Sequence, residues 1–278
     1  MDKEAVKQKT SLFSIFFTFA VDNLGATIVF PIFAPLFLEP SRGLMPADAS
    51  LAYKTTMLGF FLGIFPFMQF IFAPIMGEYA DHHGRKKALF LTTFLTFIGY
   101  ALSAFGIHHH SLSLIFIARM IMGVGAGNLS ICLSSLSDLS PSPKKKTRYY
   151  SYGSAIAGLT FILGPFLGGK LSDPQVYPLF DSAFPMMIGA ILGLVNVLFI
   201  LFAFGETLEN PSKAPFDFVR GLHNIQIALK TESIKRLYLI YFFYLFSWNI
   251  IFLFVPAFVV ENFHLSNSRI GDVCALLG

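Results

Sequence analysis

The chain has 278 residues, of which 55% are hydrophobic, 16% aromatic and only 13% charged. A soluble chain of this length could not bury so much apolar surface in one core, so the composition excludes disorder, a disulfide-rich secreted domain and most soluble enzymes. The net charge of +4 would suit nucleic acid, but the basic residues cluster between apolar runs, which favours a lipid bilayer as the partner. Cys132 and Cys274 lie in apolar runs and predict neither a disulfide framework nor a zinc site.

Seven apolar runs are each long enough to cross a bilayer as a helix, which takes about 20 residues. The runs are continuous and lack a strand-like alternation, so we expect helices. They cover residues 12–38, 55–77, 88–107, 112–136, 151–169, 183–204 and 237–260, and an eighth begins near Val273. The sequence therefore predicts an all-α membrane protein.

Lysine and arginine are distributed unevenly between the connections. Fifteen of the 20 fall in the N-terminal tail and in every second connection after it, while Arg119 lies inside a run. Basic residues near span ends mark the cytoplasmic side, so we expect a cytoplasmic N-terminus. The fifteen are Lys3, Lys7, Lys9, Arg85, Lys86, Lys87, Lys144, Lys145, Lys146, Arg148, Lys213, Arg220, Lys230, Lys235 and Arg236.

One polar connection is much longer than the others. It predicts three parts, namely a six-helix bundle at residues 1–204, a cytoplasmic linker at 205–236 and the start of a second bundle at 237–278. Two halves on this pattern need roughly 410 residues. We therefore expect the chain to be part of a longer transporter, truncated in its eighth helix, whose second half is needed for transport.

Apolar residues inside this linker recur at helical spacing. The pattern predicts an amphipathic helix on the cytoplasmic leaflet. A linker that covers the underside of the bundle and a regulatory docking site both fit the pattern. The residues are Phe218, Leu222, Ile225 and Leu229.

The first run carries a single charge, Asp22, followed by Asn23, Gly25, Pro31 and Pro35. The pattern is similar to the first helix of tetracycline and multidrug efflux proteins, D-x-x-G-x5-P-x-x-P, although the second proline comes one residue late. An ionisable residue within a membrane helix is a functional candidate by default. Asp22 is thus a candidate for proton or cation coupling, with a fold-stabilising pair as the alternative, and Asn23 is a candidate for the cavity.

The connection after the second run contains Gly77, Asp81, Gly84 and Arg85. It resembles the signature loop of the major facilitator superfamily, G-x-x-x-D-x-x-G-R-[RK]-[RK], at the place where that family has it. The glycines permit a tight return, Asp81 can cap a neighbouring helix, and Arg85 can pair with a carboxylate. A merely positive cytoplasmic loop would not explain the joint spacing.

The end of the fourth run supplies a partner for this loop. In the superfamily an acidic residue there meets the loop arginine, so the resemblance implies that Asp138 pairs with Arg85 as a cytoplasmic latch, and that Arg148 can join it. An exposed surface pair of little energetic value is the alternative.

Arg119 lies within the fourth run and is followed by Gly123, Gly125 and Gly127. The segment resembles the R-x-x-x-G-x-G-x-[AG] signature of the same superfamily. An arginine there costs roughly 2.5–3.5 kcal/mol to insert and needs a buried partner or a wet cavity. Arg119 is therefore assigned to a polar cavity with Asp22, with a purely structural arginine as the alternative.

The fifth run contains Gly158, Gly164, Pro165, Gly168 and Gly169. It resembles the antiporter signature G-P-x-x-G-G, found chiefly in proton-coupled exporters of the superfamily. The proline can kink the helix and the glycines give it a smooth face for packing against a neighbour. A packing role without any link to antiport is the alternative.

Two amides, Gln69 and Asn249, are further cavity candidates, although each can equally join helices. The histidines at 108–110 have no acidic or cysteine neighbour in sequence, so no metal is expected, and neither are a cofactor or an enzymatic activity. Together the resemblances imply a proton-coupled exporter of a small organic molecule in the bacterial inner membrane. A metabolite or siderophore-type exporter, a proton symporter of the same superfamily and a membrane protein outside transport remain alternatives.

Overall fold

A computed structural model describes residues 3–278 except 40–41, 43 and 47. Seven helical stretches in this part are long and apolar enough to cross a membrane, and each coincides with one predicted run. The prediction of an all-α membrane protein is confirmed. The stretches are Gln8–Leu38, Leu51–His83, Arg85–His108, Leu112–Asp138, Pro143–Leu171, Phe184–Phe202 and Ile234–Phe263.

Most of these stretches are one helix, but the first and the fourth are built from two helices each. The helices are α1 (Lys3–Thr27), α2 (Phe30–Leu38), α3 (Leu51–His83), α4 (Arg85–His108), α5 (Leu112–Gly125), α6 (Asn128–Asp138), α7 (Pro143–Leu171), α8 (Phe184–Phe202), α9 (Arg220–Lys230), α10 (Glu232–Phe263) and α11 (Asn267–Leu277).

The two interruptions are features that an unbroken apolar run does not reveal. In the first stretch, α1 ends at Thr27 and α2 begins at Phe30, directly before Pro31. Proline has no backbone N–H to continue the helical ladder, so the ladder breaks there. In the fourth stretch the break follows Gly125, in the glycine-rich segment, where helix propensity is lowest.

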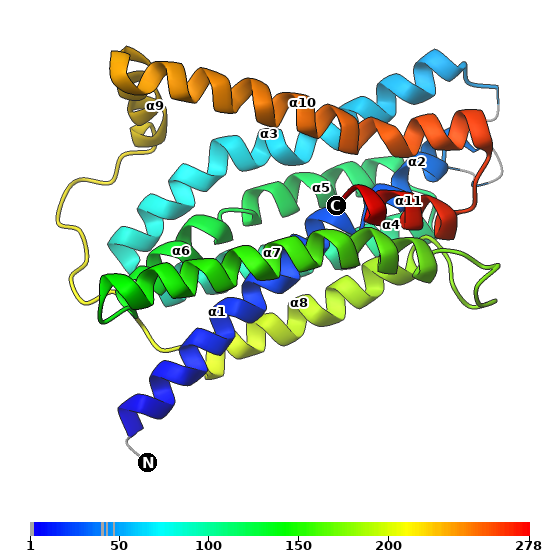
Figure 1. Cartoon of the computed structure of the whole chain (residues 1–278). Helices are drawn as coiled ribbons and strands as arrows, with labels where there is room; N and C mark the ends of the chain where they lie inside the picture. The colour runs from blue at the N-terminus through cyan, green and yellow to red at the C-terminus, as the bar shows by residue number, and fades with distance from the viewer. Residues whose placement is uncertain (1–2, 40–41, 43, 47) are drawn as a thin grey trace.

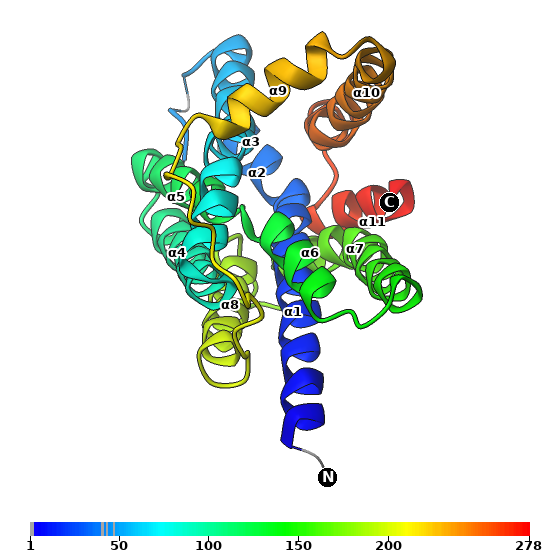
Figure 2. The same ribbon diagram turned by 90° about the vertical axis from the view of Figure 1, so that its left-hand side faces the viewer.

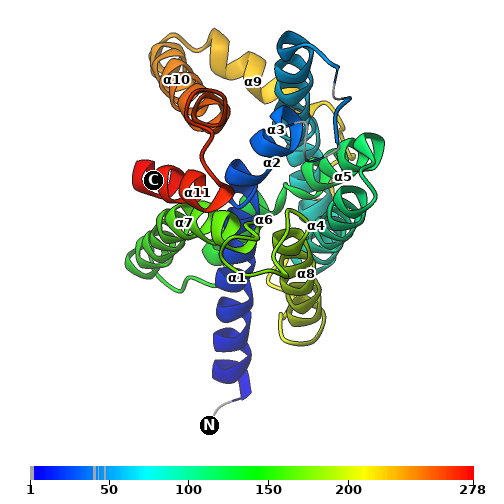
Figure 3. The ribbon, with the colours of Figure 1, turned by 90° about the vertical axis from the view of Figure 1, so that its right-hand side faces the viewer.

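Most of the long helices run roughly parallel to one another, while α1 is inclined to them and α9 lies across the end between α3 and α10 (Figures 1 and 2). Figure 2 shows α3, α4, α5 and α8 on one side and α7 and α11 on the other, with α1 between them, and Figure 3 shows the same arrangement from the opposite end. α10 stands at the edge and contacts α2, α9 and α11, and its side chains at 237–251 are exposed. The N-terminus, the α3–α4 and α6–α7 connections and α9 lie at the same end (Figure 1).

α7 crosses α1 closely at the first interruption. A methyl group placed on Gly164 would overlap the Thr27 side chain, and one on Gly168 would overlap the Ile28 carbonyl. Gly169 makes an equally close backbone contact with Gly271 of α11. Next to Gly158, by contrast, no described atom lies within 4 Å of the place a side chain would take. The close approach therefore involves the later glycines of this group and not the first.

The eighth helix begins earlier than predicted. α11 starts at Asn267 and not near Val273, because its first turn is polar and gives no apolar signal. The Asn267 amide donates to the carbonyl (3.1 Å) and hydroxyl (3.0 Å) of Ser172, and the Ser268 N–H donates to Asp173 Oδ2 (3.0 Å). The connection after α7 thus supplies the partners that let a polar turn start the helix.

A lysine at the end of α7 adds an ion pair to this junction. Lys170 Nζ lies 2.9 Å from Asp272 Oδ2 and donates to the Ser268 hydroxyl at 2.7 Å. The side chains of Lys170 and Asp272 are 31% and 43% exposed, so solvent screens their attraction. The ion pair therefore orients α7 and α11 at this junction and adds little to stability.

The predicted linker helix is present as α9. Phe218 lies before its start and is exposed, Leu229 is exposed within it, and the side chains of Leu222 and Ile225 lie outside the described part of the structure. Its location on a leaflet and the division of the chain at residues 204 and 236 stay predictions.

Asp173 yields a test of the α7–α11 junction. Burial by itself raises the pKa of its carboxyl, but hydrogen bonds from Gln175, Ser266 and Ser268, with the charge of Arg42, hold that pKa below its ordinary value. A lowered pKa means that the carboxylate stabilises the fold above the ordinary carboxyl pKa and that this contribution is lost as pH falls through the lowered value.

Asp173→Asn should therefore reduce stability by about 1–3 kcal/mol at pH 7. The measurement is thermal unfolding of detergent-solubilised protein, with the exposed Asp48→Asn as control. The difference between wild type and Asp173→Asn should shrink below about pH 4. An equal unfolding temperature at pH 7 would show that Asp173 does not hold the junction.

Candidate functional site

A small polar chamber lies beside the helix interruptions. Its volume is about 130 Å³, and its wall comes from α1, α3, α4, α5, α6 and the segment between α5 and α6. Apolar side chains form the rest of the wall. The polar members are Asp22, Asn23, Gln69, Thr96 and Tyr100.

Three predicted cavity residues thus line one chamber. Asp22 is partly buried, on the last turns of α1. Asn23 donates to the Phe19 carbonyl of its own helix (2.8 Å), and Gln69 donates from α3 to the carbonyl of Ala126 in the second interruption (3.2 Å). Gln69 is therefore both part of the chamber wall and a link between two spans.

Asn249, the fourth amide or carboxyl candidate, lies elsewhere. It is exposed on α10 and donates to the Leu245 carbonyl one turn earlier (2.8 Å). It is not part of the chamber wall.

Arg119 is enclosed by aromatic rings and not by a carboxylate. Its guanidinium carbon lies 5.4, 5.2 and 5.2 Å from the ring centroids of Phe33, Phe61 and Phe65. The residue is 4% exposed, and its Nε has no hydrogen-bond partner among the described residues. The faces of aromatic rings attract a cation, and that attraction is stronger where water is excluded.

Among the described side chains no ion pair joins Asp22 to Arg119, and the polar cavity that the sequence assigned to both stays a prediction. After the first interruption, α2 carries Phe33, whose ring meets the Arg119 guanidinium. Tyr100 is the residue near enough to both side chains to be affected by their charges.

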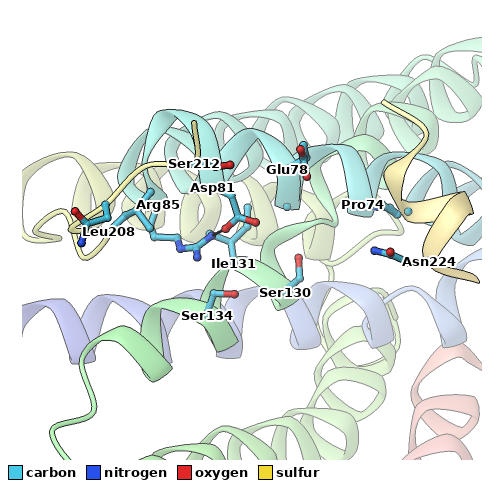
Figure 4. A pocket seen from close by; sticks show the side chains of 13 residues that line it. Pro74, Glu78, Asp81, Arg85, Ser130, Ile131, Ser134, Leu208, Ser212 and Asn224 are labelled. Atoms are coloured by element: carbon cyan, nitrogen blue, oxygen red, sulfur yellow. Dashed lines mark hydrogen bonds and ion pairs between the residues drawn. The ribbon is translucent and has the colours of Figure 1, made fainter. Parts of the chain in front are cut away.

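At the far end of α3, Arg85 lies between two carboxylates (Figure 4 shows Asp81 beside it). Its Nη1 is 2.5 Å from Asp81 Oδ1 and its Nε is 3.3 Å from Asp138 Oδ2. Arg85 is 8% exposed, so these contacts replace water around most of the side chain. The structure brings together the residues that the superfamily pattern pairs.

Arg148 does not take part in this cluster. Its Nε donates to the hydroxyl of Tyr152 at 2.6 Å, one turn along the exposed face of α7. The predicted participation of Arg148 at Asp138 has no support among the described contacts.

Glu206 is a member of the cluster that the sequence did not reveal. Its Oε1 accepts the Arg85 N–H (2.9 Å) and its Oε2 accepts the Lys86 N–H (3.1 Å). These are orphan donors of the first turn of α4, so Glu206 caps that helix, a task the sequence had assigned to Asp81. The sequence held one indication that a distant cap is needed: α4 begins directly after Gly84, and a glycine has no side chain to cap the helix.

Gly84 has two reasons to be glycine. Its φ is +99°, a conformation that side chains disfavour, and a methyl group there would overlap the Glu206 carboxylate. Gly77 is different, since the nearest atom to its missing side chain, Ser130 Oγ, lies at an ordinary 3.9 Å. The structure thus explains why position 84 is a glycine, whereas position 77 has room for a side chain.

A larger polar pocket of about 500 Å³ adjoins the cluster, between α3, α6 and the linker. The Ser212 N–H of the linker donates to the Asp81 carbonyl (2.8 Å), and His82 contacts the buried Glu78 at 3.1 Å. Figure 4 shows Ser130 and Ser134 of α6 facing Asp81 and Glu78 of α3 across this space. The linker thus runs over the loop that holds Arg85.

A sequence model of the Major Facilitator Superfamily matches residues 15–278. The chain belongs to this superfamily. With seven membrane-length apolar helical stretches among its described residues, it is an integral, multi-pass membrane protein of a transporter family.

Curated relatives agree with this assignment. The chain is 30% identical over 197 residues to the tetracycline resistance protein, class H, of Pasteurella multocida, which covers 71% of this chain and 45% of that protein. The chain spans about half the length of the tetracycline resistance proteins it matches.

Solved structures show the same fold. The human organic anion transporter MFSD10 matches 97% of this chain and 69% of its own, with a TM-score of 0.69 and 22% identity. A bacterial homolog of the human lysosomal transporter Spinster, solved inward-facing and unoccupied, matches 100% of this chain and 60% of its own, with a TM-score of 0.75 and 15% identity.

The Arg85 cluster yields a second test. Arg85→Ala should free the end of α3 from α6, so a cysteine at Ser134 in the adjoining pocket should react about threefold to tenfold faster with a thiol reagent. Lys87→Ala is the matched control, because it removes the same charge from an exposed position of the same loop. Equal rates in both variants would show that Arg85 does not hold this end closed.

Proposed function

We propose that this protein exports a small organic molecule in exchange for protons, by alternating access. The observation that carries the proposal is the chamber at the two helix interruptions, which contains a carboxyl group, Asp22, on a membrane-spanning helix. Ionisable groups within spans are rare and mark substrate or proton pathways.

The placement of the chamber supports this role. Transporters of this kind form their sites where membrane helices are discontinuous, because freed backbone groups and polar side chains can then serve a ligand. Here α1 is interrupted after Thr27 and α5 after Gly125, and both ends lie by the chamber. A volume of about 130 Å³ suits protons and a few waters, so a substrate needs a wider space.

In the proposed cycle, Asp22 releases its proton to the cytoplasmic side and accepts one from the opposite side. Arg85, Asp81 and Asp138 stabilise the conformation closed towards the cytoplasm, because their contacts hold α3 and α6 together. The close crossing of α7 over α1, through Gly164 and Gly168, restricts leakage beside the chamber.

The relatives support export as the direction. A tetracycline resistance protein is 30% identical to this chain, and the antiporter-type glycine pattern of α7 forms the close crossings described above. We further propose a cytoplasmic N-terminus in the bacterial inner membrane, because the basic connections lie at the same end as the N-terminus (Figure 1).

Asp22→Asn is the test of coupling. The substitution keeps the shape of the side chain and removes its ability to exchange a proton, so pH-gradient-driven transport should fall to background. Expression and folding should be unchanged. The measurement is uptake of a fluorescent drug into inverted vesicles from cells expressing the protein, with and without a pH gradient, and Asp48→Asn is the control.

Normal proton-driven accumulation in Asp22→Asn would reduce Asp22 to a packing residue. Movement of the drug in the same direction as the protons would favour a symporter instead.

The orientation has a separate test. Lys87→Cys should react with a membrane-impermeant thiol reagent in inverted vesicles and not in intact cells, whereas Asp48→Cys should show the reverse. Both native cysteines are buried, so their background reaction is low. Labelling of Lys87→Cys in intact cells would overturn the proposed topology.

A further inference from the structure

Asn128, the first residue of α6, has a buried side chain that makes no hydrogen bond of ordinary geometry with the described residues. It is 1% exposed, and this holds for both its Nδ2 and its Oδ1. A buried amide left without partners is destabilising, so its presence calls for an explanation.

The other buried asparagines of the described chain do not share this property. Asn196 of α8 accepts a hydrogen bond from the Thr18 hydroxyl at 2.9 Å, and Asn267 donates to Ser172. Asn128 therefore differs from the other buried asparagines of the described chain. Its amide is available for a partner that gains and loses a proton.

That partner is the carboxyl of Asp22. Asp22 lines the chamber together with Ala126 and Leu129, which lie on either side of Asn128 in the chain, and α1 contacts α6. The Asn128 amide therefore lies close to the Asp22 carboxyl. The second helix interruption ends at Gly127, so Asn128 is also held at the edge of the segment that borders the chamber.

An amide suits a neighbour that gains and loses a proton. A carboxylate only accepts hydrogen bonds, whereas a protonated carboxyl also donates one. An amide offers a donor, Nδ2–H, and an acceptor, Oδ1, and a half-turn of the side chain exchanges them. A hydroxyl or a charged side chain would favour one state much more strongly.

We propose that Asn128 is a positioning residue for the proton on Asp22. Its Nδ2–H donates to the carboxylate, and after a half-turn its Oδ1 accepts from the protonated carboxyl. The inference rests on the proposed function, since it assigns a partner to the group that carries the proton.

Other groups around Asp22 must be considered in any pH effect. The titratable or charged side chains that face this region are Tyr100 from α4, Arg119 from α5 and Cys132 from α6. Among the described residues of α7 and α8, no ionisable side chain acts on Asp22. Replacing Asn128 removes none of these ionisable groups.

The experiment compares Asn128→Ala with wild type in proteoliposomes. The readout is the pH dependence of drug-driven proton movement. Hydrogen bonds to a charged acceptor are the stronger kind, so loss of the amide disfavours the carboxylate more than the acid. The pH of half-maximal transport should therefore rise by about one unit. Asn128→Ser, which keeps a hydroxyl, should lie between the two.

Asn196→Ala is the matched control, because it removes a buried amide that is bonded elsewhere, to Thr18. It should cost stability and leave the pH of half-maximal transport unchanged. If the pH of half-maximal transport shifted equally in Asn128→Ala and Asn196→Ala, the shift would come from the loss of any buried amide. That result would overturn the proposal.

A second readout does not need transport. The infrared C=O band of protonated Asp22, identified by its absence in Asp22→Asn, should move to higher frequency in Asn128→Ala as the hydrogen bond is lost. An unchanged band, or wild-type pH dependence in Asn128→Ala, would contradict the role of Asn128. Wild-type protein without pH-dependent transport would instead refute the proposed function.

Discussion

Backbone groups within the hydrocarbon of a bilayer must find partners inside the protein, and the two helix interruptions are where this requirement is hardest to meet. Polar side chains meet it here. Gln69 donates to the carbonyl of Ala126, and Ser130 donates to the carbonyl of Gly127. Side chains that can serve an interrupted backbone can also serve a ligand, so the polar chamber and the interruptions occupy the same place. The remaining helices are arranged around this pair of breaks.

α7 connects that region with α11. Gly164 and Gly168 bring it against the break in the first span, and the next residue, Gly169, contacts α11. Lys170 then pairs with Asp272 of α11 at 2.9 Å. A continuous helix with such close contacts at both places transmits a displacement with little loss, because there are no flexible side chains between the backbones to absorb it. Movement of α1 at its interruption therefore has a direct mechanical route to α11.

The fold class and the spans were predictable because the length of an apolar run is a property of the sequence itself. The Arg85–Asp138 contact was predictable too, from the superfamily pattern. The interruption at Pro31 was not, since a proline within an apolar run can kink a helix or end it. After that break α2 carries Phe33, whose ring meets the Arg119 guanidinium. Glu206 and Asn128 depend on distant neighbours, and no local spacing shows that one amide is left without a partner.

The cap of α4 also bears on the order of biosynthesis. The donor N–H of Arg85 and the accepting carboxylate of Glu206 are 121 positions apart in the chain. Since Glu206 follows α8 in the chain, this cap can form only after the sixth span has been synthesised. Before then, water has to serve the first N–H groups of α4.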